Sequence, residues 1–344
     1  MPARNSQKLV HNPKYLVVGP LHREFSILSN GVHKMDYSAG PALMAACGLQ
    51  LWDQPIGLVS RVSQDYPAEW LNDMQSHGLD VRGIRQLSSE YDHRMFYGYE
   101  SSDSFTMTGP VGFYAKNDLP YDPRLLNYRP PIKQKNPLQE ILITSPRSVD
   151  LPADYPDAVA AHFCPMDFTT HSLLQSELRR GSVHNISLEA NPEYLLPEYW
   201  NQIANVVAGL TAFIVQEKDA RGLFRGRLND LVEMAEVIAG WGCEMVVIRC
   251  IDGSKLLYEN TSRKKWLIPE YPVERINHHS YQHAFGGGLL AGYLQTYQPL
   301  DSILYGSVSE SIAGQGLSPY YLLDTLTGFA QARLDKIREL VQPL

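Results

Sequence analysis

One late segment indicates the fold of this 344-residue chain more specifically than any other segment: His283-Ala-Phe-Gly-Gly-Gly-Leu-Leu-Ala-Gly-Tyr-Leu294. Three successive glycines, Gly286 to Gly288, lead into an apolar run of helical composition. Glycines in this place permit either a close approach of the backbone to a phosphate or close packing of the helix against a neighbour. Packing is the better interpretation, so the segment predicts a buried helix near the carboxyl end.

Upstream of this segment, apolar runs that are typical of buried strands alternate with helical runs. We expect strands at Tyr15–Gly19 and Pro55–Val59, and helices at Ala42–Leu51 and Pro67–His77, the second ended by Gly78. This order predicts an α/β fold with a mostly parallel sheet and helices on both faces.

The same alternation resumes in the second half of the chain. Strands are expected at Ile141–Thr144, Asn185–Leu188, Ala212–Val215 and Met245–Ile248. Helices are expected near Thr169–Arg180, Tyr199–Val206, Leu228–Gly240, Gly287–Thr296, Leu300–Ala313 and Leu326–Val341.

Two stretches interrupt this alternation of strands and helices. Ser26–Tyr37 and Arg94–Thr108 are rich in aromatic, Thr and Ser residues with rough alternation, which predicts exposed antiparallel strands. Pro120–Pro137 is proline-dense and polar, and we expect a surface excursion there. Residues 1–12 are polar and predict a loose N-terminal segment.

Bulk composition excludes several classes of function. The net charge of −7, with no long basic run, disfavours a nucleic-acid partner. The longest apolar run, near Val206–Val215, is about half of what a bilayer requires, so no membrane partner is expected. The four cysteines lack zinc or disulfide spacing, and no secretory signal is visible. We expect a soluble, cytoplasmic protein.

The segment at 283–294 resembles the C-terminal signature of the PfkB/ribokinase-like carbohydrate kinases, G-A-G-D-A-F-x-G-G-F-L-x-x-L. Other stretches follow in the family's order: Gly19–Glu24 with its acid, Ala39–Met44 for G-G-x-x-x-N, Val62–Asp65 for V-G-x-D, Gly78–Asp80 for G-V-D, Ser187–Pro192 for D-x-N, Gln216–Asp219 for N-x-x-E, and the turn Ile251–Gly253. The ordered set covers the chain from about Tyr15 to Leu322.

The resemblance implies one ribokinase-like domain over residues 13–344, with a small β lid built from strands at about 26–37 and 94–108. It also implies ATP and Mg²⁺ as cofactors if the protein is active, a sugar or nucleoside-like ligand, and a possible homodimer through the lid. The implied substrate-binding residues are Glu24, Gly40, Met44 and Glu189. The implied nucleotide-binding residues are Gly253, Ser280, Tyr281, Gln282 and Gly287.

The general base of the family is the aspartate of G-A-G-D, and here His283 occupies that position. The preceding glycine-rich turn, which closes backbone N–H groups around the phosphoryl group, reads Ser280-Tyr281-Gln282. An imidazole can accept a proton, but a helix N-terminus disfavours imidazolium. His283 is therefore the candidate catalytic residue and a poorer base than a carboxylate.

The metal and sugar positions also depart from the family. Gln216 and Asp219 keep the chemical types of N-x-x-E with each functional group moved by one methylene, so they remain candidates for the Mg²⁺ shell. Met44 replaces an amide that hydrogen-bonds a sugar hydroxyl, and it suits a core position equally well. A zinc site at His278, His279 and His283 is disfavoured, because no supporting ligand spacing accompanies these histidines.

Three functions remain compatible with this fold, since a fold does not settle a function. The first is a catalytically impaired kinase-like protein, or pseudokinase, with a ligand-binding or regulatory role. The second is an active, divergent ATP-dependent carbohydrate kinase that phosphorylates a small-molecule hydroxyl, with His283 or Glu24 as base. The third is a protein-interaction scaffold that uses the lid and the 120–137 excursion.

Overall fold

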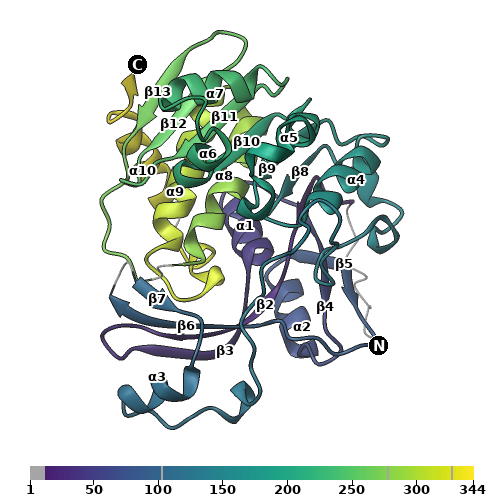
Figure 1. The fold of residues 1–344 in the computed structure, drawn as a ribbon, viewed down its shortest axis with the longest axis vertical. Coiled ribbons are helices and arrows are strands. Elements are labelled where there is room, and N and C mark those ends of the chain that lie inside the picture. The colour runs from purple at the N-terminus through teal and green to yellow at the C-terminus, as the bar shows by residue number, and fades with distance from the viewer. Residues whose placement is uncertain (1–11, 102–103, 277–278, 327) are drawn as a thin grey trace, which may run out of the picture.

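A computed structural model describes residues 12–101, 104–276, 279–326 and 328–344, and it has the expected α/β architecture (Figure 1). Within those ranges the main sheet has ten strands, in the order β14-β13-β12-β11-β10-β9-β8-β1-β4-β5. Their bounds are β1 Tyr15–Val18, β4 Ile56–Val62, β5 Leu79–Gln86, β8 Ala160–Phe163, β9 Asn185–Glu189, β10 Ala212–Gln216, β11 Met245–Arg249, β12 Lys255–Glu259, β13 Lys265–Ile268 and β14 Gln342–Pro343.

The strands from β11 to β5 run parallel to their neighbours, whereas β12, β13 and β14 form an antiparallel edge. The helices that connect and cover them are α1 Pro41–Gln50, α2 Ala68–Ser76, α3 Pro110–Lys116, α4 Phe168–Leu178, α5 Trp200–Val207, α6 Glu217–Leu223, α7 Leu231–Ala239, α8 Ala284–Thr296, α9 Pro299–Ala313 and α10 Phe329–Arg338. No helix in the described ranges is both long and apolar enough to cross a bilayer.

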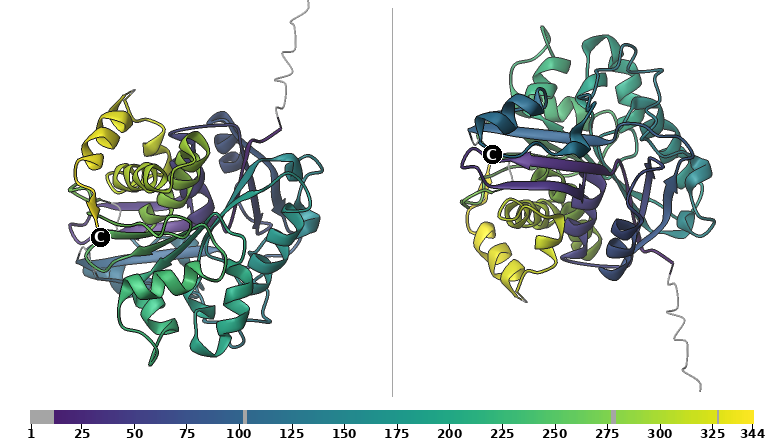
Figure 2. Two further views of the ribbon diagram at one scale, coloured as in Figure 1. Left: turned by 90° about the horizontal axis from the view of Figure 1, so that it is seen from above. Right: turned by 90° about the horizontal axis from the view of Figure 1, so that it is seen from below.

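Helices cover both faces of the main sheet, as the alternating pattern predicted. Side chains alternate along β1, so that Tyr15 and Val17 join one core and Leu16 and Val18 join the other. Figure 2 shows the sheet between the two layers, with α8 to α10 on one side and α4 to α7 on the other.

The lid is a separate four-stranded sheet in the order β3-β2-β6-β7. Its strands are β2 His22–Ile27, β3 His33–Ala39, β6 Arg94–Ser101 and β7 Ser104–Thr106, which overlap the segments 26–37 and 94–108 expected for the lid. The expectation of purely antiparallel pairing was wrong, because β2 and β6 run parallel. The lid is thus two hairpins joined along β2 and β6.

One face of the lid is covered by the chain itself. Helix α3 and the short 3₁₀ turn Pro123–Leu125 pack Phe113, Tyr114 and Leu125 against Phe96 of β6, and α3 lies below the lid strands in Figure 1. Part of the proline-dense 120–137 stretch therefore covers the lid. The homodimer through the lid stays a prediction.

The strand expected at Ile141–Thr144 was wrong. This segment forms a loop and turn in which Ile141 and Ile143 are 43% and 44% exposed. The strand at this position of the sheet is β8, whose sequence Ala-Ala-His-Phe has weaker strand propensity. The loose segment predicted for residues 1–12 lies outside the described residues, apart from residue 12.

Helix α8 packs closely against α1, and its glycines make this contact possible. A Cβ added to Gly287 would overlap the carbonyl oxygen of Ala45 in α1, and one added to Gly286 would overlap the ring of His162 in β8. A Cβ on Gly288 would overlap Ser309 in α9. The packing interpretation of the three glycines is therefore supported by the structure.

Candidate functional site

Three neighbouring strands end in polar side chains at one edge of the main sheet. Glu189 ends β9, Gln216 ends β10 and Arg249 ends β11. The 3₁₀ turn Tyr281–His283, which precedes α8, contacts this edge through the Gln282 carbonyl and the His283 ring. The carboxyl edge of a parallel sheet is where open α/β proteins bind ligands.

Glu189 joins two basic side chains that come from different elements. Its Oε1 accepts a hydrogen bond from Arg249 Nη1 at 3.0 Å, and its Oε2 accepts one from His283 Nδ1 at 2.9 Å. Burial raises the pKa of the Glu189 carboxyl, but the charges of His283 and Arg249 outweigh burial and lower the pKa to about 2. Glu189 is therefore ionised at neutral pH.

The contact with Glu189 fixes the orientation of His283. Because a carboxylate only accepts hydrogen bonds, Nδ1 of His283 carries a proton. In the neutral form of the ring Nε2 is the proton acceptor, and this is the arrangement in which a carboxylate orients a catalytic histidine. The structure thus brings two predicted residues, Glu189 and His283, together. An oriented imidazole stands where the family resemblance places a free carboxylate as the base.

Glu24 lies in lid strand β2 and is only 1% exposed. Its carboxylate accepts hydrogen bonds from Tyr37 Oη at 3.1 Å, His279 Nε2 at 2.9 Å and Ser280 Oγ at 3.1 Å. Burial raises the pKa of the Glu24 carboxyl, but the charge and hydrogen bond of His279, together with the nearby His22 ring, hold the pKa below its usual range. Three donors of this chain therefore already surround the Glu24 carboxylate.

His279 joins this carboxylate to a second lid strand, β6. Its ring stacks on Tyr97 with centroids 3.7 Å apart, and its Nδ1 lies 2.5 Å from Tyr99 Oη. Both tyrosines belong to β6. The loop before α8 is therefore packed onto the lid across the position where the family resemblance places the sugar.

A polar cavity of about 390 Å³ opens beside the Tyr281–His283 turn. It is lined by four of the predicted residues, namely Gln216, Gly253, Tyr281 and Gln282. Two buried cations, Arg249 and Lys255, add positive charge, although Lys255 Nζ pairs with Glu310 at 2.7 Å. Arg249 Nε has no hydrogen-bond partner within the described residues, so this cavity offers a buried donor to an anionic ligand.

The turn at Gly253 requires glycine. Its φ of 84° lies in the left-handed region, and a Cβ there would overlap the Glu270 carboxylate. Glu270 is itself paired with Arg275, and both line the cavity. The glycine turn that the sequence motif predicted is therefore present at the mouth of this cavity.

The two candidates for a Mg²⁺ shell differ in position. Gln216 lines the polar cavity, whereas Asp219, in the first turn of α6, is not among its lining residues. Burial raises the pKa of the Asp219 carboxyl. The described part of the chain holds no group of three or more His, Cys, Asp or Glu side chains arranged to bind a metal. The Mg²⁺ assignment stays a prediction, and of its two candidate residues Gln216 lines the polar cavity.

The remaining predicted residues support the site from beneath or beside it. Met44 is 1% exposed in the core, and Gly287 is buried against α1, so both residues serve packing. Gly40, with φ 107°, precedes α1 and lies against the backbone of Pro20 and His22. Ser280 contacts Glu24 and does not line the polar cavity.

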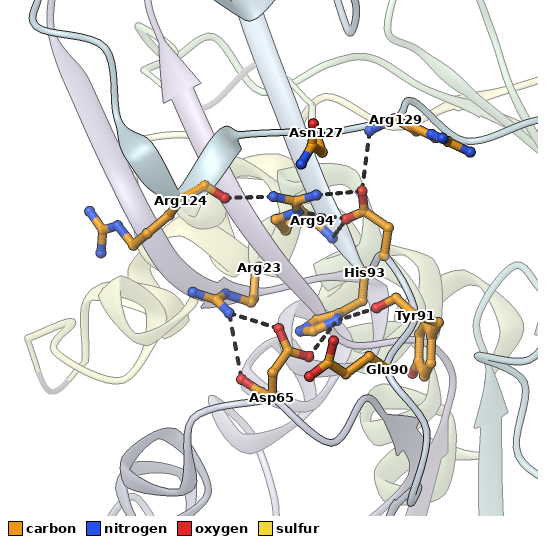
Figure 3. A pocket seen from close by; sticks show the side chains of 10 residues that line it. Arg23, Asp65, Glu90, Tyr91, His93, Arg94, Arg124, Asn127 and Arg129 are labelled. Atoms are coloured by element: carbon orange, nitrogen blue, oxygen red, sulfur yellow. Dashed lines mark hydrogen bonds and ion pairs between the residues drawn. The ribbon is translucent and has the colours of Figure 1, made fainter.

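A larger cavity, of about 550 Å³, lies beneath the lid and is lined by charged side chains (Figure 3). Arg23 pairs with Asp36 and Asp65, and Arg94 pairs with Asp92. These arginines are already neutralised by neighbouring carboxylates. The cations beside the turn are paired as well, so the argument for that cavity as the anion site depends on the buried Arg249 Nε, which has no hydrogen-bond partner within the described residues.

Motif matching missed two residues that organise the site, Arg249 and His279. Arg249 follows the predicted buried strand Met245–Ile248, and a charged residue at the carboxyl end of such a strand is the signal that points to it. The sequence alone suggests His279 only as a disfavoured zinc ligand. Its contact with Glu24 joins residues 255 positions apart, and nothing local in the sequence indicates it.

Comparisons with known proteins agree with this architecture. No protein-family model matches the chain. The cytidine kinase of Thermococcus kodakarensis is 24% identical over 282 residues, which cover 81% of this chain and 87% of that protein.

Two solved structures share the fold over nearly their whole length. A protein from E. coli described as a ribokinase II, in complex with ATP and Mg²⁺, has a TM-score of 0.68 and 13% identity, covering 94% of this chain and 99% of that one. Aminoimidazole riboside kinase from Salmonella enterica, complexed with aminoimidazole riboside and an ATP analogue, has a TM-score of 0.62 and 13% identity, covering 93% and 99%. The fold is that of the ribokinase-like kinases. The resemblance to the PfkB/ribokinase-like family that the motifs indicated is confirmed.

Proposed function

We propose that this chain is a PfkB-like sugar or nucleoside kinase homologue that binds ligands but transfers phosphoryl groups poorly, and that it has a ligand-binding or regulatory role. One observation carries the proposal: both acids at the family's positions, Glu24 and Glu189, are buried and already accept hydrogen bonds from neighbouring side chains. His279 and Ser280 engage Glu24, while His283 and Arg249 engage Glu189. No carboxylate occupies the position of the general base.

The expected loss of phosphoryl-transfer rate can be estimated from the usual size of two catalytic effects. Loss of a positioned general base typically costs 10²- to 10⁴-fold in rate. Bulky side chains at Tyr281 and Gln282 replace the glycines that approach the phosphoryl group, and a lost anion-stabilising donor costs a further ~10²-fold. Binding is less affected than chemistry, because the polar cavity retains Arg249 and the glycine turn.

ATP is the ligand that we propose for the polar cavity. The buried, unpaired Nε of Arg249 supports this assignment, as does the complex of the E. coli neighbour with ATP and Mg²⁺. When bound, ATP supplies the phosphoryl group and Mg²⁺ neutralises its charge. Gln216 is the residue of this chain that lies at the cavity and has the chemistry to orient a hydrated metal ion.

A thermal-shift titration tests the binding part of the proposal. MgATP at 100 times its dissociation constant should add about 2.7 kcal/mol of stability. Ile251→Glu places a negative charge at the rim of the cavity, where Ile251 is 79% exposed, and should weaken MgATP at least roughly tenfold. Val149→Glu, at a position 86% exposed outside this cavity, is the matched control. Absence of any MgATP shift in the unmodified protein contradicts the proposal.

The pairing of His283 with Glu189 favours a second candidate function, an active divergent carbohydrate kinase. An imidazole held by an ionised carboxylate has the geometry of a general base. This candidate predicts ordinary turnover in the unmodified protein and a loss of turnover in Glu189→Gln. The first proposal predicts turnover that is already low before any substitution.

A further inference from the structure

A cavity of about 490 Å³ lies between the lid and the carboxyl edge of the main sheet. Its floor includes Pro20, Pro165 and Asn191, which follow the neighbouring strands β1, β8 and β9. Its walls come from the start of β6 and from two loops, residues 129–132 and 142–144. None of the residues that the family motifs indicate as catalytic, substrate-binding or nucleotide-binding lines it.

Apolar side chains dominate this cavity. Pro41, Met95 and Pro131 form its walls, and Ile132 and Ile143 at its rim are 84% and 44% exposed. Ligand cavities of this size typically combine apolar walls with a few placed polar groups. A sugar with many hydroxyls would leave most of them unpaired against such walls, whereas the faces of a flat ring would be buried favourably.

His93 supplies one of the placed polar groups. It is 2% exposed, and its Nδ1 lies 3.2 Å from the carbonyl oxygen of Tyr91 and 3.9 Å from Asp65, contacts that Figure 3 draws. Because a carbonyl only accepts, Nδ1 carries the proton and Nε2 is an acceptor. That Nε2 is buried and has no donor anywhere in the described ranges. Burial lowers the pKa of His93, which agrees with a neutral ring.

His22 supplies a second polar group and connects the cavity to the Glu24 cluster. It lines the cavity, its Nδ1 is buried, and that nitrogen lacks a hydrogen-bond partner among the described residues. The same Nδ1 lies 3.9 Å from Glu24 Oε1. One end of the cavity therefore borders the carboxylate that the family resemblance assigns to substrate hydroxyls.

We propose that this cavity binds the flat heteroaromatic ring of a nucleoside-like ligand, with an amino or ring N–H group of the ligand donating to His93 Nε2. The hydroxyl-bearing part of the ligand then points toward His22 and Glu24. This inference rests on the proposed ligand-binding function and gives it a substrate class: nucleosides in preference to simple sugars. Ile143 and Pro131 form the apolar wall against the ring.

Isothermal titration calorimetry with cytidine, whose amino group is a donor, tests this assignment. Ribose serves as the probe without a ring, and N4,N4-dimethylcytidine as the ring without an amino donor. Cytidine should bind about tenfold or more tightly than either, since a buried acceptor left unpaired costs at least that factor. His93→Phe should remove the difference between cytidine and its dimethyl analogue.

A matched pair of surface variants keeps the test valid even if His93→Phe fails to fold. Ile143→Trp fills the cavity from its rim and should weaken cytidine at least roughly tenfold. Ile141→Trp has nearly the same exposure, 43% against 44%, but does not line the cavity, and it should bind cytidine unchanged.

Two results would overturn the inference. Equal affinity for ribose and cytidine, unaffected by Ile143→Trp, would show that no ring site exists. Absence of cytidine binding up to millimolar concentration, with MgATP still stabilising the protein, would overturn the ring site and leave the proposed function intact. If neither cytidine nor MgATP binds, the proposed function fails as well.

Discussion

At the scale of single residues, Glu189 holds two basic groups in a buried position. Removing its charge leaves Arg249 and His283 without their counter-ion, and a broken buried pair of this kind costs about 3 kcal/mol or more. Glu189→Gln should therefore lower the free energy of unfolding by that amount in urea denaturation. Glu177→Gln, which breaks the exposed pair with Arg180, should change it by less than about 0.5 kcal/mol. Equal effects of the two substitutions would contradict the account of the Glu189 cluster.

Individual site residues were predictable from the sequence only where a motif contains them. Glu189 and His283 each stand in a recognisable segment, and the structure shows that they touch. Arg249 was not predicted, because its partner Glu189 lies 60 positions away and no local pattern links the two. The burial of Glu24 beneath His279 and Ser280 likewise depends on the packing of the lid against a distant loop.

At the scale of elements, the contact between α1 and α8 sets the position of the Tyr281–His283 turn. Gly287→Ala places a methyl group against the Ala45 carbonyl and should destabilise the protein by about 3 kcal/mol, measured by thermal or urea unfolding. Gly222→Ala in α6 is the matched control, since a Cβ there meets nothing within 4 Å. It should be neutral or stabilise the protein by up to about 1 kcal/mol. Tolerance of Gly287→Ala would mean that the helices pack less closely than described.

The longer helices and the central strands β1, β4, β9, β10 and β11 were predictable because their apolar patterns are strong, whereas strands such as β5, β12 and β13 were not predicted. The error at Ile141–Thr144 shows the limit of that signal: four residues of high strand propensity form an exposed turn, while Ala160–Phe163 pairs with β1 and β9. Strand pairing is decided by neighbours distant in the sequence, so a short apolar run does not by itself determine whether a strand forms. The parallel pairing of β2 with β6 was missed for the same reason.

At the scale of the whole molecule, buried histidines predict acid sensitivity. Burial lowers the pKa of His162 and of His171 to about 4. The unfolded chain takes up these protons at an ordinary pKa of about 6.5, so it binds more protons than the folded chain between pH 6.5 and 4. Stability should therefore fall as the pH drops through this window, by at most about 1.4 kcal/mol per pH unit for each histidine.

Chemical denaturation between pH 7 and pH 4 measures this slope, and His171→Gln isolates one contribution. His171 is fully buried, with Nε2 donating to the Cys164 carbonyl and Nδ1 accepting from Tyr194 Oη. The variant is expected to be less stable at pH 7 and to lose stability less steeply on acidification. An unchanged slope would mean that His171 does not remain neutral in the folded protein.

The chemistry of the whole site depends on whether an imidazole tied to Glu189 can replace a free carboxylate as the base. The most direct measurement is the steady-state rate of ATP-dependent phosphorylation of cytidine and ribose by the unmodified protein and by His283→Asp. The account predicts a rate at least about 10²-fold below the 1–100 s⁻¹ typical of kinases, rising when the aspartate is introduced. Turnover within that typical range by the unmodified protein, lost in His283→Asp, would contradict it.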